Sequence, residues 1–130
     1  MFQLSKEETK ALRNYLLLPY LKRVLEIDTK WVNHSKMKLP RPYLELIHAA
    51  ITLASSDLKW AKAMLHDRGI HVYIEDTKED VVICKVYCRG YNQTYRYSSI
   101  QIRNQVERRI LAYFLADDRL KKKEHSLCLK

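Results

Sequence analysis

The sequence predicts an α+β domain in which three to four N-terminal helices precede a three-stranded antiparallel meander, with a C-terminal helix packed on the sheet. Apolar residues recur at helical spacing up to residue 69 and then alternate with polar residues over 70–98. The 130-residue chain is 47% hydrophobic and holds only 2 glycines and 3 prolines, which indicates long elements around one core. We expect a single compact domain over residues 1–119 and a basic, frayed tail over 120–130.

The first helix has a clear start signal. Ser5 can cap it, and Glu8, three residues later, completes a capping box. Pro19 lies inside the apolar pattern that follows. Because proline lacks a backbone donor and clashes with the preceding turn, we expect a kink or a break near Leu18. The polar segment 28–42, which carries two prolines, is predicted to link this helix to the next.

Two further helices are predicted before the sheet. Pro42 suits a first helical turn, and residues 44–54 are so uniformly apolar that they indicate a central, buried helix. The ASSD segment at 54–57 is rich in residues that cap helices. We therefore expect a third helix to begin there and to end at Gly69.

The strands follow from the change of period. Short runs rich in Val, Ile and Tyr are separated by polar turns at DTKED (76–80) and around GYNQ (90–93), which predicts a meander. A last helix opens at Ser98 or Ser99. Its apolar stripe is the natural cover for the sheet face that carries Val82 and Cys84.

The three cysteines do not indicate a disulfide or zinc site. Cys84 and Cys88 are four residues apart on a predicted strand, so they lie about 13 Å apart and read as small buried side chains. No secretory signal core and no apolar run of about 18 residues is present. We expect a cytoplasmic protein with no membrane partner.

No pattern of an enzyme is present. The five histidines lack the spacing of a helical metal pair, and two glycines cannot build a phosphate-binding glycine loop. His48 stands in the most apolar helix and is expected to be a core histidine. We expect no enzymatic activity, no cofactor and no metal.

The basic charge and the predicted outer sheet face favour nucleic acid as a partner. The formal net charge is +9, which permits an anionic ligand. Tyrosines beside cations on a sheet can stack bases, with about 1–3 kcal/mol per base. We therefore predict a small accessory or regulatory protein that binds nucleic acid through the sheet and the last helix. The predicted contact residues are Tyr73, Lys85, Tyr87, Arg89, Tyr95, Arg96, Tyr97, Arg103, Arg108 and Arg109.

Two alternatives stay open. Tyrosine is favoured in strands for packing alone, so the same sheet and the apolar first helix also fit a protein–protein interaction module, either a homodimer or an adaptor. Two helices meeting at 54–57, followed by a hairpin, resemble the order of a winged helix that binds DNA. The acidic residues of the expected wing tip, at 75–80, would repel phosphates and count against that alternative.

Overall fold

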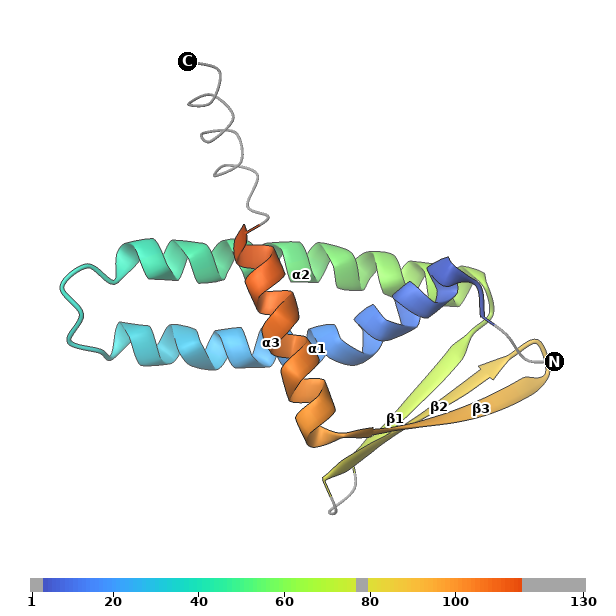
Figure 1. Cartoon of the computed structure of the whole chain (residues 1–130). Coiled ribbons are helices and arrows are strands. Elements are labelled where there is room, and N and C mark those ends of the chain that lie inside the picture. Colours follow the sequence, from blue (N-terminus) through green and yellow to red (C-terminus); the bar gives the residue numbers. More distant parts are fainter. Residues whose placement is uncertain (1–3, 77–79, 116–130) are drawn as a thin grey trace.

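The computed structural model describes residues 4–76 and 80–115 and shows a long helical hairpin, a small sheet and a crossing helix. Helices α1 and α2 run side by side, the sheet lies at one end of this pair, and α3 lies across it (Figure 1). The α+β class and the three-stranded antiparallel meander are confirmed, but two helices precede the sheet where three to four were predicted. The elements are α1 (Lys6–Asn33), α2 (Arg41–Asp67), β1 (His71–Asp76), β2 (Val81–Cys88), β3 (Tyr91–Ser98) and α3 (Ser99–Leu115).

Helix α1 begins at the predicted capping box and continues past Pro19. The Glu8 backbone N–H donates to Ser5 Oγ (3.1 Å), and Glu8 Oε1 accepts from the Ser5 N–H (2.9 Å). Pro19 is exposed, so its ring lies on the solvent side of the helix. The helix is not broken there, and Figure 1 shows its first half inclined to its second half. The expected linker is shorter than predicted because residues 28–33 are helical.

Helix α2 is one continuous element, so the separate third helix predicted at 54–57 is wrong. The turn that the winged-helix alternative requires is therefore not present in this part of the chain. Serine and aspartate cost only a few tenths of a kcal/mol in a helix interior, and an unbroken buried stripe outweighs that cost. The stripe runs at spacings of three and four through Ile47, Ala50, Ala54, Leu58, Ala61 and Leu65.

Only this one stripe of α2 is buried, which corrects the prediction of a helix surrounded by core. His48 is exposed and is not a core histidine. The end of the helix agrees with the sequence: Gly69 follows it with φ +66°, in the left-handed region that suits glycine.

The sheet has the order β1-β2-β3, and its register fixes two distinct faces. Ile74 pairs with Cys84, and Cys84 pairs with Tyr95, so these three residues share one face. This inner face packs on both helices of the hairpin, against Leu12 of α1 and Leu65 of α2. Cys84 and Cys88 are both buried and unpaired, as predicted.

Helix α3 covers the hairpin more than the sheet, which corrects its predicted place. It meets the sheet near its own start, where Ile102 packs in one cluster with Val82. Two polar contacts hold the rest of α3 on the hairpin. Arg109 Nη1 donates to Asn14 Oδ1 of α1 (2.8 Å) in one, and the Tyr113 hydroxyl donates to Asp57 Oδ2 of α2 (2.6 Å) in the other. Burial, and after it the hydrogen bond to Asp57, raise the pKa of Tyr113 to about 12.

The continuity of α2 predicts the effect of substitutions at Ser56, an exposed residue. Ser56→Ala should raise the free energy of unfolding by about 0.5 kcal/mol, because alanine is the better residue in a helix interior. Ser56→Gly should lower it by a similar amount. Denaturant unfolding measures both. A loss of about 1 kcal/mol for alanine, with glycine tolerated, would instead identify Ser56 as an N-cap and contradict a continuous helix.

Candidate nucleic-acid interface

The outer face of the sheet carries four of the ten predicted contact residues. Tyr73 and Tyr87 are 58% and 41% exposed, and their rings meet edge to face with centroids 5.6 Å apart. The register places Lys85 and Arg96 on the same face. The Nζ of Lys85 lies 3.5 Å from the carboxylate of Glu75, which offsets its charge. This face is therefore aromatic, and one of these two cations is offset by Glu75.

Tyr95 and Tyr97 lie on the opposite face, so the prediction that they join an outer tyrosine platform is wrong. They pair with Cys84 and Val82, whose side chains point to the hairpin. Their rings stack at a centroid distance of 6.5 Å and are partly buried, and burial raises the pKa of Tyr97. Because side chains alternate along a strand, Arg96 points to the opposite face from Tyr95 and Tyr97. The sequence alone could therefore have predicted this arrangement.

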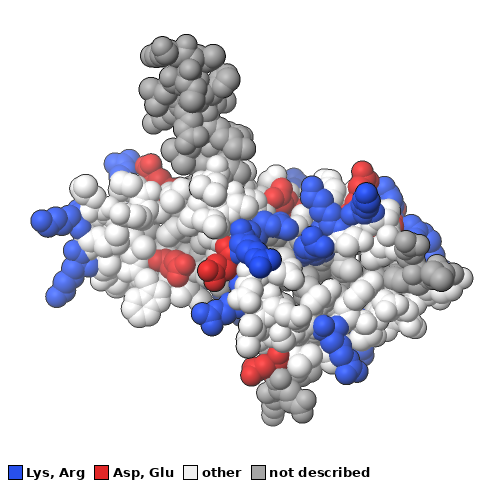
Figure 2. All heavy atoms as spheres, viewed as in Figure 1, with Lys and Arg blue, Asp and Glu red and all other residues white. Residues whose placement is uncertain are grey.

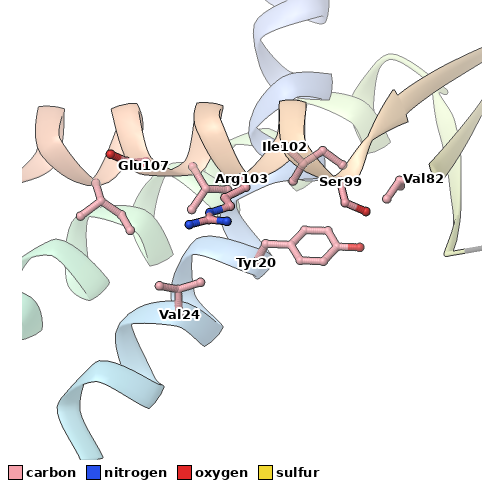
Figure 3. Close-up of a pocket in the computed structure, with 9 residues that line it drawn as sticks. Tyr20, Val24, Val82, Ser99, Ile102, Arg103 and Glu107 are labelled. Atoms are coloured by element: carbon pink, nitrogen blue, oxygen red, sulfur yellow. The ribbon is translucent and has the colours of Figure 1, made fainter. Parts of the chain in front are cut away.

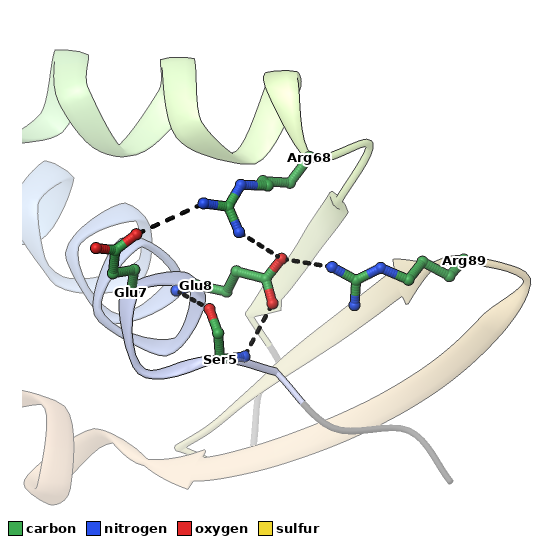
Figure 4. Close-up of polar contacts among 5 residues, drawn as sticks. All are labelled: Ser5, Glu7, Glu8, Arg68 and Arg89. Carbon is green, nitrogen blue, oxygen red and sulfur yellow. Dashed lines mark hydrogen bonds and ion pairs between the residues drawn. The ribbon is translucent and has the colours of Figure 1, made fainter.

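Arg89 forms an ion pair with a buried carboxylate of the protein, although its own side chain is 54% exposed. It occupies a two-residue turn between β2 and β3 with φ 53°, and its Nη2 lies 2.7 Å from Glu8 Oε2 (Figure 4). Arg68 at the end of α2 approaches the same oxygen at 3.5 Å. Glu8 is only 1% exposed. The backbone N–H of Ser5 and the positive charge of Arg89 lower the pKa of Glu8 despite its burial.

These contacts form what we call the Glu8 cluster, which consists of Ser5, Glu7, Glu8, Arg68 and Arg89. It joins the start of α1, the end of α2 and the β2–β3 turn. The two guanidinium groups both contact the buried carboxylate and offset its negative charge. We therefore assign this cluster to stability and not to ligand binding.

One flank of α3 forms a basic groove with α1. The groove is lined by Arg13 and Leu17 of α1 and by Gln105, Arg108, Arg109 and Ala112 of α3. Figure 2 shows Lys and Arg side chains gathered where α3 crosses α1. Arg13 and Arg108 are exposed, whereas Arg109 is partly buried and held by the neutral amide of Asn14. Within the described residues, none of the three arginines forms an ion pair with a carboxylate.

The other flank of α3 forms an apolar groove of about 510 Å³ with α1 and β2 (Figure 3). Arg103 lies there beside Tyr20 and Val24, with Ser99 and Glu107 one turn away on either side. Arg103 is thus on the opposite flank from Arg108 and Arg109. The prediction that all three extend one positive surface is wrong, because residues five and six apart on a helix face different sides.

Neither a metal site nor a membrane span is found in the described part of the chain. No group of three or more His, Cys, Asp or Glu residues among residues 4–76 and 80–115 is placed to hold a metal ion. No helix in the same residues is both long enough and apolar enough to cross a membrane. The predicted basic tail at 120–130 lies outside the described residues.

The chain is a small α+β protein in which a helical hairpin is crossed by a third helix and carries a sheet at one end. The chain belongs to the YhjD protein family, whose model matches residues 3–118 and so includes every element described above. It is similar to a protein of Bacillus subtilis (strain 168) named "Uncharacterized protein YhjD", at 28% identity over 120 residues, 92% of this chain and 100% of the relative. No solved structure matches the chain.

The Glu8 cluster predicts a pH-dependent stability. The folded-state pKa of Glu8 lies below the unfolded value of about 4.3, so its contribution is present above that pH and is lost as the pH falls through the folded value. Glu8→Gln should lower the free energy of unfolding by about 1–3 kcal/mol at pH 7. The difference from the parent should shrink below about pH 4. Denaturant unfolding across pH measures this.

Glu26→Gln is the control for this experiment because Glu26 is an exposed residue of the same helix. It should change stability by less than about 0.5 kcal/mol at either pH. A Glu8→Gln difference that stays constant with pH would show that the carboxylate charge does not hold the three elements together.

Proposed function

We propose that this protein is a non-enzymatic accessory or regulatory protein that binds nucleic acid through its basic groove. The observation that carries the proposal is the convergence of Arg13, Arg108 and Arg109 from two helices into one concave surface. Phosphate contacts provide most of the affinity of such proteins for nucleic acid, and arginine matches phosphate geometry with paired donors.

The groove is partly preorganised for an anion. The hydrogen bond from Arg109 to the buried Asn14 fixes one guanidinium before any ligand arrives, so less side-chain entropy is lost on binding. Gln105 adds a neutral side chain that can donate to a phosphate oxygen. Arg13 and Arg108 are exposed and remain available on the rim.

This proposal moves the contact surface from the sheet to the helices. Of the ten residues predicted from sequence, Arg108 and Arg109 line the groove, and Arg13 joins them from α1. The outer sheet face supports phosphate binding less well because Glu75 lies beside Lys85. A surface of this kind contacts the backbone and favours binding with little dependence on base sequence.

Charge removal in the groove tests the proposal. The double substitution Arg13→Gln and Arg108→Gln should weaken binding of labelled single- and double-stranded oligonucleotides by about tenfold or more. It should also reduce the slope of log affinity against log salt by about 2, because two phosphate contacts are lost. Fluorescence anisotropy between about 50 and 200 mM salt measures both.

The matched control removes the same net charge elsewhere. Lys36→Gln with Lys38→Gln alters two exposed lysines in the loop between α1 and α2. This variant should bind oligonucleotides nearly as the parent does. Equal losses in the two variants would mean that net charge and not the groove attracts the ligand. No binding by the parent at low salt would exclude the proposal.

The uncovered outer sheet face favours a second candidate, a protein-contact surface that includes self-association. No described element packs on this face, and its two exposed tyrosines offer rigid, amphipathic contact area. If the chain is a homodimer through this face, light scattering after size-exclusion chromatography should give twice the monomer mass. The double substitution Tyr73→Ser and Tyr87→Ser should then give a monomer. A parent that stays monomeric at high concentration would contradict self-association.

A further inference from the structure

The loop that joins α1 and α2 exposes large apolar side chains at the end of the hairpin remote from the sheet. We call residues 30–43 the hairpin tip; it is the cyan loop in Figure 1 with the adjoining helix ends. Trp31 and Leu39 are each 73% exposed, Tyr43 is 52% exposed and Met37 is 40% exposed. Exposed apolar residues that cluster in this way mark an interaction surface.

Three of these side chains lie on one surface. Trp31 at the end of α1, Met37 in the loop and Tyr43 at the start of α2 line a single hollow. Leu39 follows Met37 by two residues and is as exposed as Trp31. The hollow also reaches Asp28 of α1 and Ile110 and Phe114 of α3, whereas the sheet lies at the other end of the hairpin.

Lysines alternate with the apolar residues of the tip. Lys36, Met37, Lys38 and Leu39 follow one another in the sequence, and both lysines are exposed. Among the described residues, neither lysine forms an ion pair, whereas Arg41 pairs with Glu45 at 3.3 Å. Figure 2 shows Lys and Arg side chains projecting from this end of the molecule.

We propose that the hairpin tip docks on the surface of an anionic lipid bilayer. Trp31 and Leu39 enter the boundary between headgroups and acyl chains, where indole rings are favoured, and Lys36 and Lys38 contact lipid phosphates. A second copy is a poorer occupant of the tip, because a two-fold contact of tip against tip would bring like-charged lysines together. The expectation of no membrane partner rested on the lack of spanning segments, and surface docking requires none.

Tryptophan fluorescence and vesicle sedimentation test the proposal. In a Trp60→Phe background, Trp31 is the only tryptophan, and its emission should shift to the blue with vesicles of phosphatidylcholine and phosphatidylglycerol but not with phosphatidylcholine alone. Lys36→Gln with Lys38→Gln should weaken sedimentation with the anionic vesicles by about tenfold. Trp31→Ser with Leu39→Ser, made in the natural background, should weaken it by at least as much.

A variant of α2, away from both the tip and the basic groove, is the control of equal net charge. Lys59→Gln with Lys62→Gln, at two exposed positions of α2, should sediment with anionic vesicles as the parent does, and all variants should keep the parent's thermal unfolding midpoint because the altered side chains are exposed. No blue shift, or equal loss in the α2 variant, would overturn the proposal. A parent dimer that Trp31→Ser with Leu39→Ser converts to monomer, without vesicle binding, would overturn it and assign the tip to a second copy.

Discussion

The apolar contact between α1 and α2 is the constraint on which the rest of the structure depends. Leu18, Leu21 and Leu25 of α1 are at most 1% exposed, and they share a core cluster with Ala50 and Ala54 of α2. Small residues on one helix against leucines on the other allow close packing along the pair. The sheet packs on one end of this pair and α3 crosses its middle, so neither has a surface to pack on without the hairpin.

The sequence predicts the sheet well because its signals are local. Alternation with a period of two, together with polar turns, is complete within each strand, and it also identified the burial of Cys84 and Cys88. The helices were harder to predict. At 54–57 the capping signal is as local as a turn signal, but the stripe that overrides it is buried against α1, a contact that only the tertiary structure makes. The number of helices was therefore predicted wrongly, because local capping signals and tertiary packing disagree at this position.

The candidate site was less predictable than the fold for a related reason. Arg108 and Arg109 were expected to belong to a positive surface, but Arg13 joins them only because α3 crosses α1 at that point. A crossing angle is set by how side chains of both helices interlock, which composition does not reveal. The opposite placement of Arg103, and of Tyr95 relative to Arg96, could have been read from helical and strand periodicity. The ion pair of Arg89 was not predicted because its partner Glu8 is distant in the sequence.

The length of α1 sets a separation within the molecule. Residues 13 and 31 stand on the same helix, so about 27 Å of helix axis lies between the basic groove and the hairpin tip. A second helix braces α1 along this length, which makes the pair a stiff spacer. A polyanion held at the crossing would thus stand clear of any surface that the tip touches. A rigid hairpin would let the basic groove and the hairpin tip be occupied at the same time without steric conflict.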